Sequence, residues 1–170
     1  MKNAMRILFS VLLVAGVAAC AKKAVKPTAS SDTTPTADTS ATNNDGRYKV
    51  GDLDTDSCLR QRVVYFDLDR TEIKPEFSAQ ISCHAEYLRQ FPNARVTLEG
   101  HADERGTREY NLGLGERRGN AVQSAISSAG ASGGQLNVVS YGEERPVDRG
   151  HDESAWSKNR RVEIVYTSAN

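Results

Sequence analysis

The sequence has no excess of either charge, because 22 lysines and arginines face 22 aspartates and glutamates in 170 residues. Nucleic-acid binding therefore receives no electrostatic support. No internal repeat is visible, and the length allows one ordinary domain with tails.

The sequence also lacks the H-E-x-x-H and C-x-x-C spacings of zinc sites. We expect no nucleophile elbow of a serine hydrolase. Two clusters could still ligate zinc or manganese through nitrogen and oxygen: His101 with Asp103 and Glu104, and residues 151–153 (HDE). No third histidine lies near either cluster in the sequence, and we interpret both as polar loops without a metal.

The longest apolar run lies near the N-terminus, in residues 7–17, and is shorter than the roughly 20 residues that a membrane-spanning helix needs. Lys2 and Arg6 precede the run and two alanines follow it, as in a secretory signal peptide. We therefore predict a signal peptide in residues 1–19, with an N-terminal anchor helix as the alternative.

Residues 17–20, VAAC, resemble a bacterial lipobox, with valine where leucine is commoner. The resemblance implies cleavage before Cys20 and lipid modification of this cysteine, and several acyl chains hold a protein firmly on a membrane. Ala21 stands where an aspartate would favour retention in the inner membrane, so we expect the outer membrane.

Large apolar side chains are scarce in the segment that follows, which is rich in Ala, Thr, Ser, Asp and Lys. Such a composition cannot bury enough apolar surface to offset its ordering entropy. We predict a lipidated, flexible tether over residues 20–57 and a folded domain over residues 58–170.

Strand and helix patterns alternate in the folded part. We predict Asn111 as the N-cap of the second helix, and Gly130 marks its end. The order βαβαβ(α)β predicts an α/β two-layer sandwich, a mixed four-stranded sheet with helices on one face. Strands are expected in residues 62–66, 95–100, 135–142 and 161–166, helices in 75–91 and 111–129, and one helical turn in 154–156.

An acidic and a basic residue flank the start of the long helix. Asp103 lies in the preceding loop, and Arg118 lies about two turns inside the helix. If the helix packs beside the strand, the two side chains converge on one pocket. An arginine fork binds a carboxylate and an aspartate accepts hydrogen bonds from an ammonium, so the pair suits a zwitterion. The alternative is a salt bridge that only ties the loop to the helix.

The folded part contains a series of short motifs: VYFD at 64–67, EGHADERGT at 99–107, EYN at 109–111, LGERR at 114–118, VSYGE at 139–143 and KNRR at 158–161. In this order, they resemble the motifs of the peptidoglycan-associated lipoproteins (Pal). The resemblance covers about residues 58–167, and the lipobox and tether agree with it. It implies the OmpA C-terminal-like fold and non-covalent binding of peptidoglycan.

In that family the ligand is the diaminopimelate of the peptide stem. The resemblance implies that Asp103 takes its ammonium and Arg118 its carboxylate. Pal proteins also bind the periplasmic propeller protein TolB on an overlapping surface, within the Tol–Pal system that draws the outer membrane inward during division. The other site residues implied are Phe66 and Asp67 in the pocket wall, Asn111 and Leu114 at the helix start, and Arg161 at the border.

Two features depart from the family pattern. Gly119 stands where alanine is usual, and Cys58 and Cys83 are not required by the fold. Once Cys20 is lipidated, these two are the only thiols, and the periplasm is oxidising. We predict a disulfide between them, with two buried free thiols as the alternative.

We therefore expect a binding and structural protein that needs no cofactor, not an enzyme. His101 is expected to orient its loop through a ring hydrogen bond, and Trp156 to cover the core or its edge. Two other classes remain open. A peptidoglycan-acting hydrolase would need a nucleophile or metal beside Asp103, and a pure protein-interaction module would bind TolB but not the cell wall.

Overall fold

The computed structural model describes residues 48–170. The predicted signal peptide, the predicted lipidation site at Cys20 and the predicted tether up to residue 47 lie outside the described residues. Within the described part of the chain, no helix is both long and apolar enough to cross a bilayer.

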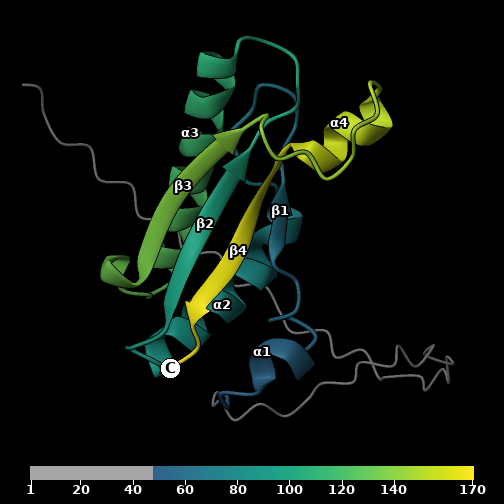
Figure 1. Ribbon diagram of the computed structural model, residues 1–170. Coiled ribbons are helices and arrows are strands. Elements are labelled where there is room, and N and C mark those ends of the chain that lie inside the picture. The colour runs from purple at the N-terminus through teal and green to yellow at the C-terminus, as the bar shows by residue number, and fades with distance from the viewer. Residues whose placement is uncertain (1–47) are drawn as a thin grey trace, which may run out of the picture. The chain divides into compact units, whose positions relative to one another are not determined.

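Four strands form one sheet: β1 (Val63–Tyr65), β2 (Arg95–His101), β3 (Leu136–Gly142) and β4 (Arg161–Ser168). Their order in the sheet is β1-β4-β2-β3 (Figure 1). Strand β4 runs antiparallel to both neighbours, whereas β2 and β3 are parallel. The predicted mixed four-stranded sheet is confirmed.

Two long helices, α2 (Ser78–Gln90) and α3 (Arg108–Ser128), lie on the same side of this sheet (Figure 1). A shorter helix, α4 (Glu153–Asn159), replaces the single turn that was predicted. It lies at the end of the sheet where β2 and β3 finish and β4 begins (Figure 1). The remaining short elements are α1 (Asp52–Thr55) and the 3-10 turns η1 (Pro75–Phe77) and η2 (Gly133–Gln135).

The core lies between the sheet and the two long helices. Val96 and Leu98 of β2 are buried in it, as the predicted alternation requires. On the helix side, Ile81 and Leu88 of α2 and Val122 of α3 are buried in the same cluster. These residues recur at the spacing that puts one face of a helix against a sheet.

Glycines allow α3 to lie very close to the sheet. A Cβ at Gly115 would stand 2.4 Å from the Ser140 hydroxyl oxygen and 2.8 Å from the Gly100 carbonyl oxygen. A Cβ at Gly119 would stand 2.5 Å from the Val138 side chain. Gly119 is therefore a packing residue on the inner side of α3.

Helix α3 begins before Asn111, so the predicted N-cap is wrong. Thr107 is the N-cap, and its hydroxyl oxygen accepts a hydrogen bond from the Tyr110 N–H at 3.2 Å. Threonine and asparagine are both good N-caps, so residue type alone does not choose between them. The earlier start places Asn111 inside the helix and Arg118 about one turn deeper than predicted.

The ordered domain starts earlier than Cys58, the predicted boundary. Leu53 of α1 is buried in the core cluster, and the Arg62 side chain donates a hydrogen bond to its carbonyl oxygen. The Tyr48 and Tyr87 rings lie 6.0 Å apart. One leucine and one tyrosine thus dock this polar segment on the core, and the tether does not extend to residue 57.

A disulfide joins Cys58 to Cys83, whose Cα atoms are 6.3 Å apart. It ties the segment before β1 to the middle of α2. This bond lies in the half of the domain away from the loops that follow β1 and β2.

Candidate ligand-binding site

A cavity of about 320 Å³ opens at the end of the sheet, where β1 and β2 finish and α3 begins. Four predicted site residues line it: Asp103, Asn111, Leu114 and Arg118. The loop and the helix therefore bring these side chains to one place, as the sequence predicted. Its other lining residues are Leu68, Asp69, Arg105, Gly106, Tyr110 and Arg160, none of which was predicted.

Arg118 forms the floor of the cavity and is fully buried. Its guanidinium donates to three backbone carbonyl oxygens: those of Arg70 and His101 at 2.9 Å, and that of Asp67 at 3.0 Å. The guanidinium also lies 5.3 Å from the Phe66 ring centre. Burial lowers the pKa of Arg118 to about 10, which leaves the side chain charged at neutral pH.

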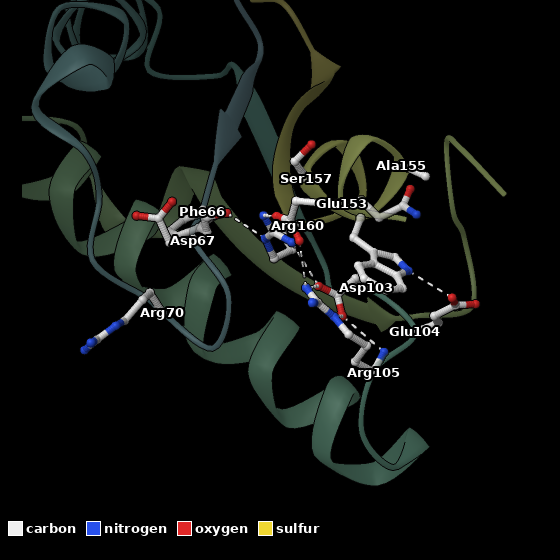
Figure 2. A network of polar contacts seen from close by, with 12 residues as sticks. Phe66, Asp67, Arg70, Asp103, Glu104, Arg105, Glu153, Ala155, Ser157 and Arg160 are labelled. Atoms are coloured by element: carbon white, nitrogen blue, oxygen red, sulfur yellow. Dashed lines mark hydrogen bonds and ion pairs between the residues drawn. The ribbon is translucent and has the colours of Figure 1, made fainter. Parts of the chain in front are cut away.

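Asp103 is also buried, but side chains rather than backbone carbonyls hold it. One carboxylate oxygen accepts from the Arg105 N–H and Nε at 3.1 and 3.2 Å. The other accepts from Nη2 of Arg105 at 2.7 Å and Nη1 of Arg160 at 3.2 Å (Figure 2). Burial opposes ionisation, but the hydrogen bonds from the two arginines outweigh it and hold the pKa of Asp103 below its ordinary value.

The ion pairs of the described residues do not include one between Asp103 and Arg118. The alternative prediction, a salt bridge that ties the loop to the helix, is therefore not what the structure contains. Asp103 has other partners, and Arg118 donates to carbonyl oxygens instead. The two opposite charges face the same cavity without neutralising each other directly.

Arg160 takes the position at the border that the sequence had assigned to Arg161. Its Nε donates to the Phe66 carbonyl oxygen at 3.1 Å, and its Nη2 lies 2.5 Å from a Glu153 carboxylate oxygen. Arg161 does not line the cavity and pairs with Glu163. Val162 enters the core, so Arg161, its neighbour in the strand, points to the opposite face of the sheet, where it is also buried and donates to the Arg145 carbonyl oxygen at 3.3 Å.

Phe66 and Asp67 contribute to the site mainly through their backbone. Phe66 is buried in the core, and the Asp67 carboxylate pairs with Lys74 at 2.8 Å. Both residues line a second cavity of about 340 Å³, which shares Arg160 with the first. In the first cavity they act through the carbonyl oxygens that hold the arginines.

The rim of the cavity combines apolar and polar groups. Leu68 and Tyr110 are large and exposed, and the Tyr110 hydroxyl donates a hydrogen bond to Asp69. Asn111 is buried and donates from Nδ2 to Glu143 at 2.5 Å, which fixes the first turns of α3. Leu114 adds an apolar wall. Leu68 and Asp69 could not be found from the sequence, because they come from the loop after β1, far along the chain from Asp103 and Arg118.

His101 does not have the predicted role. Within the described residues both of its buried ring nitrogens lack a hydrogen-bond partner, so the ring does not orient the loop in that way. The ring stacks on Tyr141 with centres 5.6 Å apart, and burial lowers the pKa of His101 to about 4. It is a neutral packing residue behind the β2 end of the site.

Neither polar cluster forms a metal site in the described part of the chain, which contains no suitable group of three ligands. Glu104 instead bonds to His151 at 2.8 Å. Residues 130–134 match the letters G-x-S-x-G, but they join α3 to η2 instead of a strand to a helix, and the Ser132 side chain caps η2. They are therefore not a nucleophile elbow.

Comparison with known proteins agrees with this architecture. The profile of the OmpA family matches residues 65–160. The chain is 44% identical to a peptidoglycan-associated lipoprotein of Haemophilus influenzae, over 90% of this chain and 92% of that one. It is 50% identical to the Pseudomonas aeruginosa peptidoglycan-associated lipoprotein, over 67% and 68% of the two chains.

Solved structures show the same relationship. The crystal structure of the Burkholderia pseudomallei peptidoglycan-associated lipoprotein matches with a TM-score of 0.66 and 43% identity, covering 69% of this chain and 98% of that chain. The C-terminal domain of Helicobacter pylori MotB, at 21% identity and a TM-score of 0.57, shares the fold. The chain therefore belongs to the OmpA family and, within it, to the peptidoglycan-associated lipoproteins.

Proposed function

We propose that this protein is an outer-membrane lipoprotein whose periplasmic domain binds peptidoglycan non-covalently, as part of the Tol–Pal system that maintains the outer membrane during division. Its family consists of structural lipoproteins, so the protein is not an enzyme. The lipid on Cys20 would hold one end in the membrane while the domain binds the cell wall.

The ligand that we propose is the diaminopimelate of the peptide stem. Its free end carries an ammonium and a carboxylate, which we assign to Asp103 and to Arg118 respectively. The observation that carries this assignment is that both charged side chains line one cavity of about 320 Å³ and do not pair with each other. Buried charges of opposite sign in one cavity favour a zwitterion over either ion alone.

Other residues of the site have supporting roles in this proposal. Leu114 offers an apolar wall to the methylene chain of diaminopimelate, and Asn111 holds the start of α3. Phe66 and Asp67 support the floor and border through their carbonyl oxygens. Arg160 takes the place that the family resemblance had given to Arg161.

Sedimentation with purified peptidoglycan tests the proposal. Asp103→Asn keeps the shape of the side chain but removes its charge, and we expect it to abolish co-sedimentation. Asp54→Asn is the matched control, because Asp54 is exposed and lies outside the cavity. Circular dichroism would show that both variants fold, and free meso-diaminopimelate should release the wild type. Unchanged sedimentation of a folded Asp103→Asn protein would refute the assignment.

We also propose a TolB-type propeller protein as a partner of the same end of the domain. Besides the family resemblance, the exposed Leu68 and Tyr110 at the cavity rim support a protein contact there. Capture of purified TolB by the protein, and its release by excess stem peptide, would be the expected result. Capture that stem peptide leaves unchanged would place TolB on another surface.

A further inference from the structure

Arg105 makes two kinds of contact at once. Its guanidinium holds Asp103 through Nε and Nη2, at 3.2 and 2.7 Å. The same guanidinium lies 4.1 Å from the ring centre of Trp156, so it stacks on the indole. Arg105 therefore occupies the carboxylate that the ligand's ammonium has to reach.

The indole that carries Arg105 is itself fixed. Trp156 Nε1 donates to a Glu104 carboxylate oxygen at 2.9 Å, and His151 bonds to the same carboxylate at 2.8 Å. Asp152 caps α4 by accepting from the Ala155 N–H at 3.1 Å. Glu104 thus connects the loop after β2 to Trp156 of α4 and to His151, which precedes this helix. Trp156 is a platform for a protein side chain, a role beyond covering the core.

Two arginines and Glu153 surround Asp103. Arg160 lies 2.5 Å from Glu153 and is only 6% exposed, so it forms a fixed pair that also touches Asp103. Arg105 pairs with Asp103 at 2.7 Å and more weakly with Glu153 at 3.5 Å, and the Arg105 side chain is 32% exposed. Of the two arginines on Asp103, Arg105 is the one that can leave without burying an unpaired charge.

We propose that Arg105 determines the specificity of the site by exchange of charge partners: the ligand's ammonium replaces Arg105 on Asp103, and the released Arg105 takes the ligand's carboxylate at the rim. This inference rests on the proposed function and refines its binding mode. In this binding mode Arg105 becomes a second partner of the ligand's carboxylate, in addition to Arg118. Arg118 does not move, and it keeps its three hydrogen bonds to backbone carbonyl oxygens.

The exchange explains why a zwitterion is needed. A ligand with only an ammonium would displace Arg105 from Asp103 and leave that guanidinium with only its longer pair to Glu153, at 3.5 Å. A ligand with only a carboxylate would find Arg105 already neutralised by Asp103. A ligand with both groups replaces one ion pair by two, and the indole of Trp156 keeps the released guanidinium beside the cavity.

Three synthetic tripeptides test the exchange in titration calorimetry with the full chain. The first is L-Ala-γ-D-Glu-meso-diaminopimelate. The second has L-lysine in the third position, whose side chain ends in an ammonium but no carboxylate, and the third has 2-aminopimelate, whose side chain ends in a carboxylate but no ammonium. All three keep the same C-terminal α-carboxylate. We expect each analogue to bind the wild type about ten- to a hundredfold more weakly than the first peptide.

The decisive variant is Arg105→Gln, because it removes the competing cation and the carboxylate partner together. It should bind the diaminopimelate peptide more weakly and the lysine peptide more tightly than the wild type, reducing the preference between them by about tenfold or more. The 2-aminopimelate peptide should stay weak. Arg108→Gln is the control, because Arg108 is exposed, pairs with Glu144 and lies outside the cavity.

The outcomes separate the exchange from the proposed function. If Arg105 were only a carboxylate ligand, its removal would leave the affinity for the lysine peptide unchanged, and that result would overturn the exchange alone. If the diaminopimelate peptide did not bind the wild type, the proposed function would fall and the exchange with it. Folding of Arg105→Gln is checked by its thermal transition.

Trp156 is a positioning residue in this scheme, since it acts through Arg105. Trp156→Phe keeps an aromatic face and should keep the preference for diaminopimelate over lysine within about threefold of the wild type. Trp156→Leu removes the platform and should weaken the diaminopimelate peptide while leaving the lysine peptide unaffected. Equal weakening of both peptides by Trp156→Leu would mean that the indole supports only the shape of the cavity.

Discussion

The floor and the rim of the cavity hold their charges in different ways. Arg118 on the floor donates to three carbonyl oxygens, from the loop after β1 and from the end of β2. Asp103 at the rim is held by the arginines at positions 105 and 160. A backbone partner cannot leave without a change of fold, whereas a side-chain partner can turn away. The floor is therefore part of the fold, and the rim is able to rearrange around a ligand.

The electrostatic surroundings follow the same division. At the floor, burial dominates and lowers the pKa of Arg118 to about 10. At the rim, burial would raise the pKa of Asp103, but hydrogen bonds from the arginines more than compensate and lower it. Both groups are charged at neutral pH. Of the two, only Asp103 has a pKa that is set by the side chains of other residues, which a ligand could replace.

The strongest test of this comparison removes the floor. Arg118→Met keeps an apolar stem but leaves three carbonyl oxygens without their donor. We expect the free energy of unfolding to fall by about 3–5 kcal/mol, measured by urea denaturation. Arg117→Met, one residue away on the exposed side of α3, should change it by less than about 0.5 kcal/mol. Similar losses in the two variants would contradict a structural floor.

Any substitution of Arg118 that removes its guanidinium should also weaken the fold, because the carbonyl contacts of this side chain join three segments of chain. Loss of peptidoglycan binding in such a variant would therefore not identify a ligand contact by itself. Asp103→Asn and Arg105→Gln are better probes of binding.

Removing the disulfide should lower the stability of the domain without changing its binding site. Replacing both Cys58 and Cys83 by serine should lower the free energy of unfolding by about 3 kcal/mol, because the bond closes a loop with a sequence separation of 25. Peptidoglycan co-sedimentation at a temperature where the variant is folded should be unchanged. Lost binding in the folded variant would show that the far half of the domain controls the cavity.

Acid should act on the core before it acts on the rim. His84 donates from Nε2 to the Gln61 carbonyl oxygen at 3.0 Å, so its Nδ1 accepts from the Tyr166 hydroxyl at 2.9 Å. Burial lowers the pKa of His84 to about 4. Between the ordinary value of about 6.5 and that value, the unfolded chain binds a proton that the folded chain refuses.

Stability should therefore fall as the pH falls from about 6.5 to about 4 and then level off with respect to this group, for a loss of about 2–3 kcal/mol. His84→Gln should reduce the pH dependence of the free energy of unfolding by about one proton over that range. His101, with the same lowered pKa, should supply a second proton in both proteins. An unchanged slope in His84→Gln would show that His84 is not the group responsible.

The smallest effect on stability is expected at the outer edge of the rim. His151 is exposed, and its bond to Glu104 raises the pKa of His151 and lowers that of Glu104. Exposed pairs contribute little to stability, so His151→Ala should leave the urea midpoint unchanged. It should also leave the binding of the diaminopimelate peptide intact, since Glu104 keeps its bond to Trp156. A clear fall in the urea midpoint of His151→Ala would show that the His151–Glu104 pair stabilises the fold, as Arg118 does on the floor.

Most of the fold was predictable from the sequence because local patterns specify it. The alternation in residues 95–100 and 161–166 located β2 and β4, and the helical spacing after Pro75 located α2. The errors lie where local signals compete. Thr107 and Asn111 are both possible caps, and Leu53 is one apolar residue in a polar segment.

The site was predictable only in part. Asp103 and Arg118 were correctly placed on one cavity, since a strand, a loop and a helix that are consecutive in the sequence fold back on each other. Arg160 was missed in favour of Arg161, because the fold places the boundary between α4 and β4 at these two neighbours: Arg160 is the C-cap of α4 and lines the cavity, and Arg161 is the first residue of β4. Arg105 was not singled out, because its stacking partner Trp156 comes from another part of the chain.

The sequence by itself determined the order of the elements, the opposite charges beside the helix start and the family of the chain. The tertiary structure decided which partner each charge has. Asp103 and Arg160 are 57 positions apart and Arg118 and Asp67 are 51 positions apart, so no local pattern relates them. Periodicity and capping act over a few residues, whereas the strength of a buried charge depends on every group that the fold brings near it.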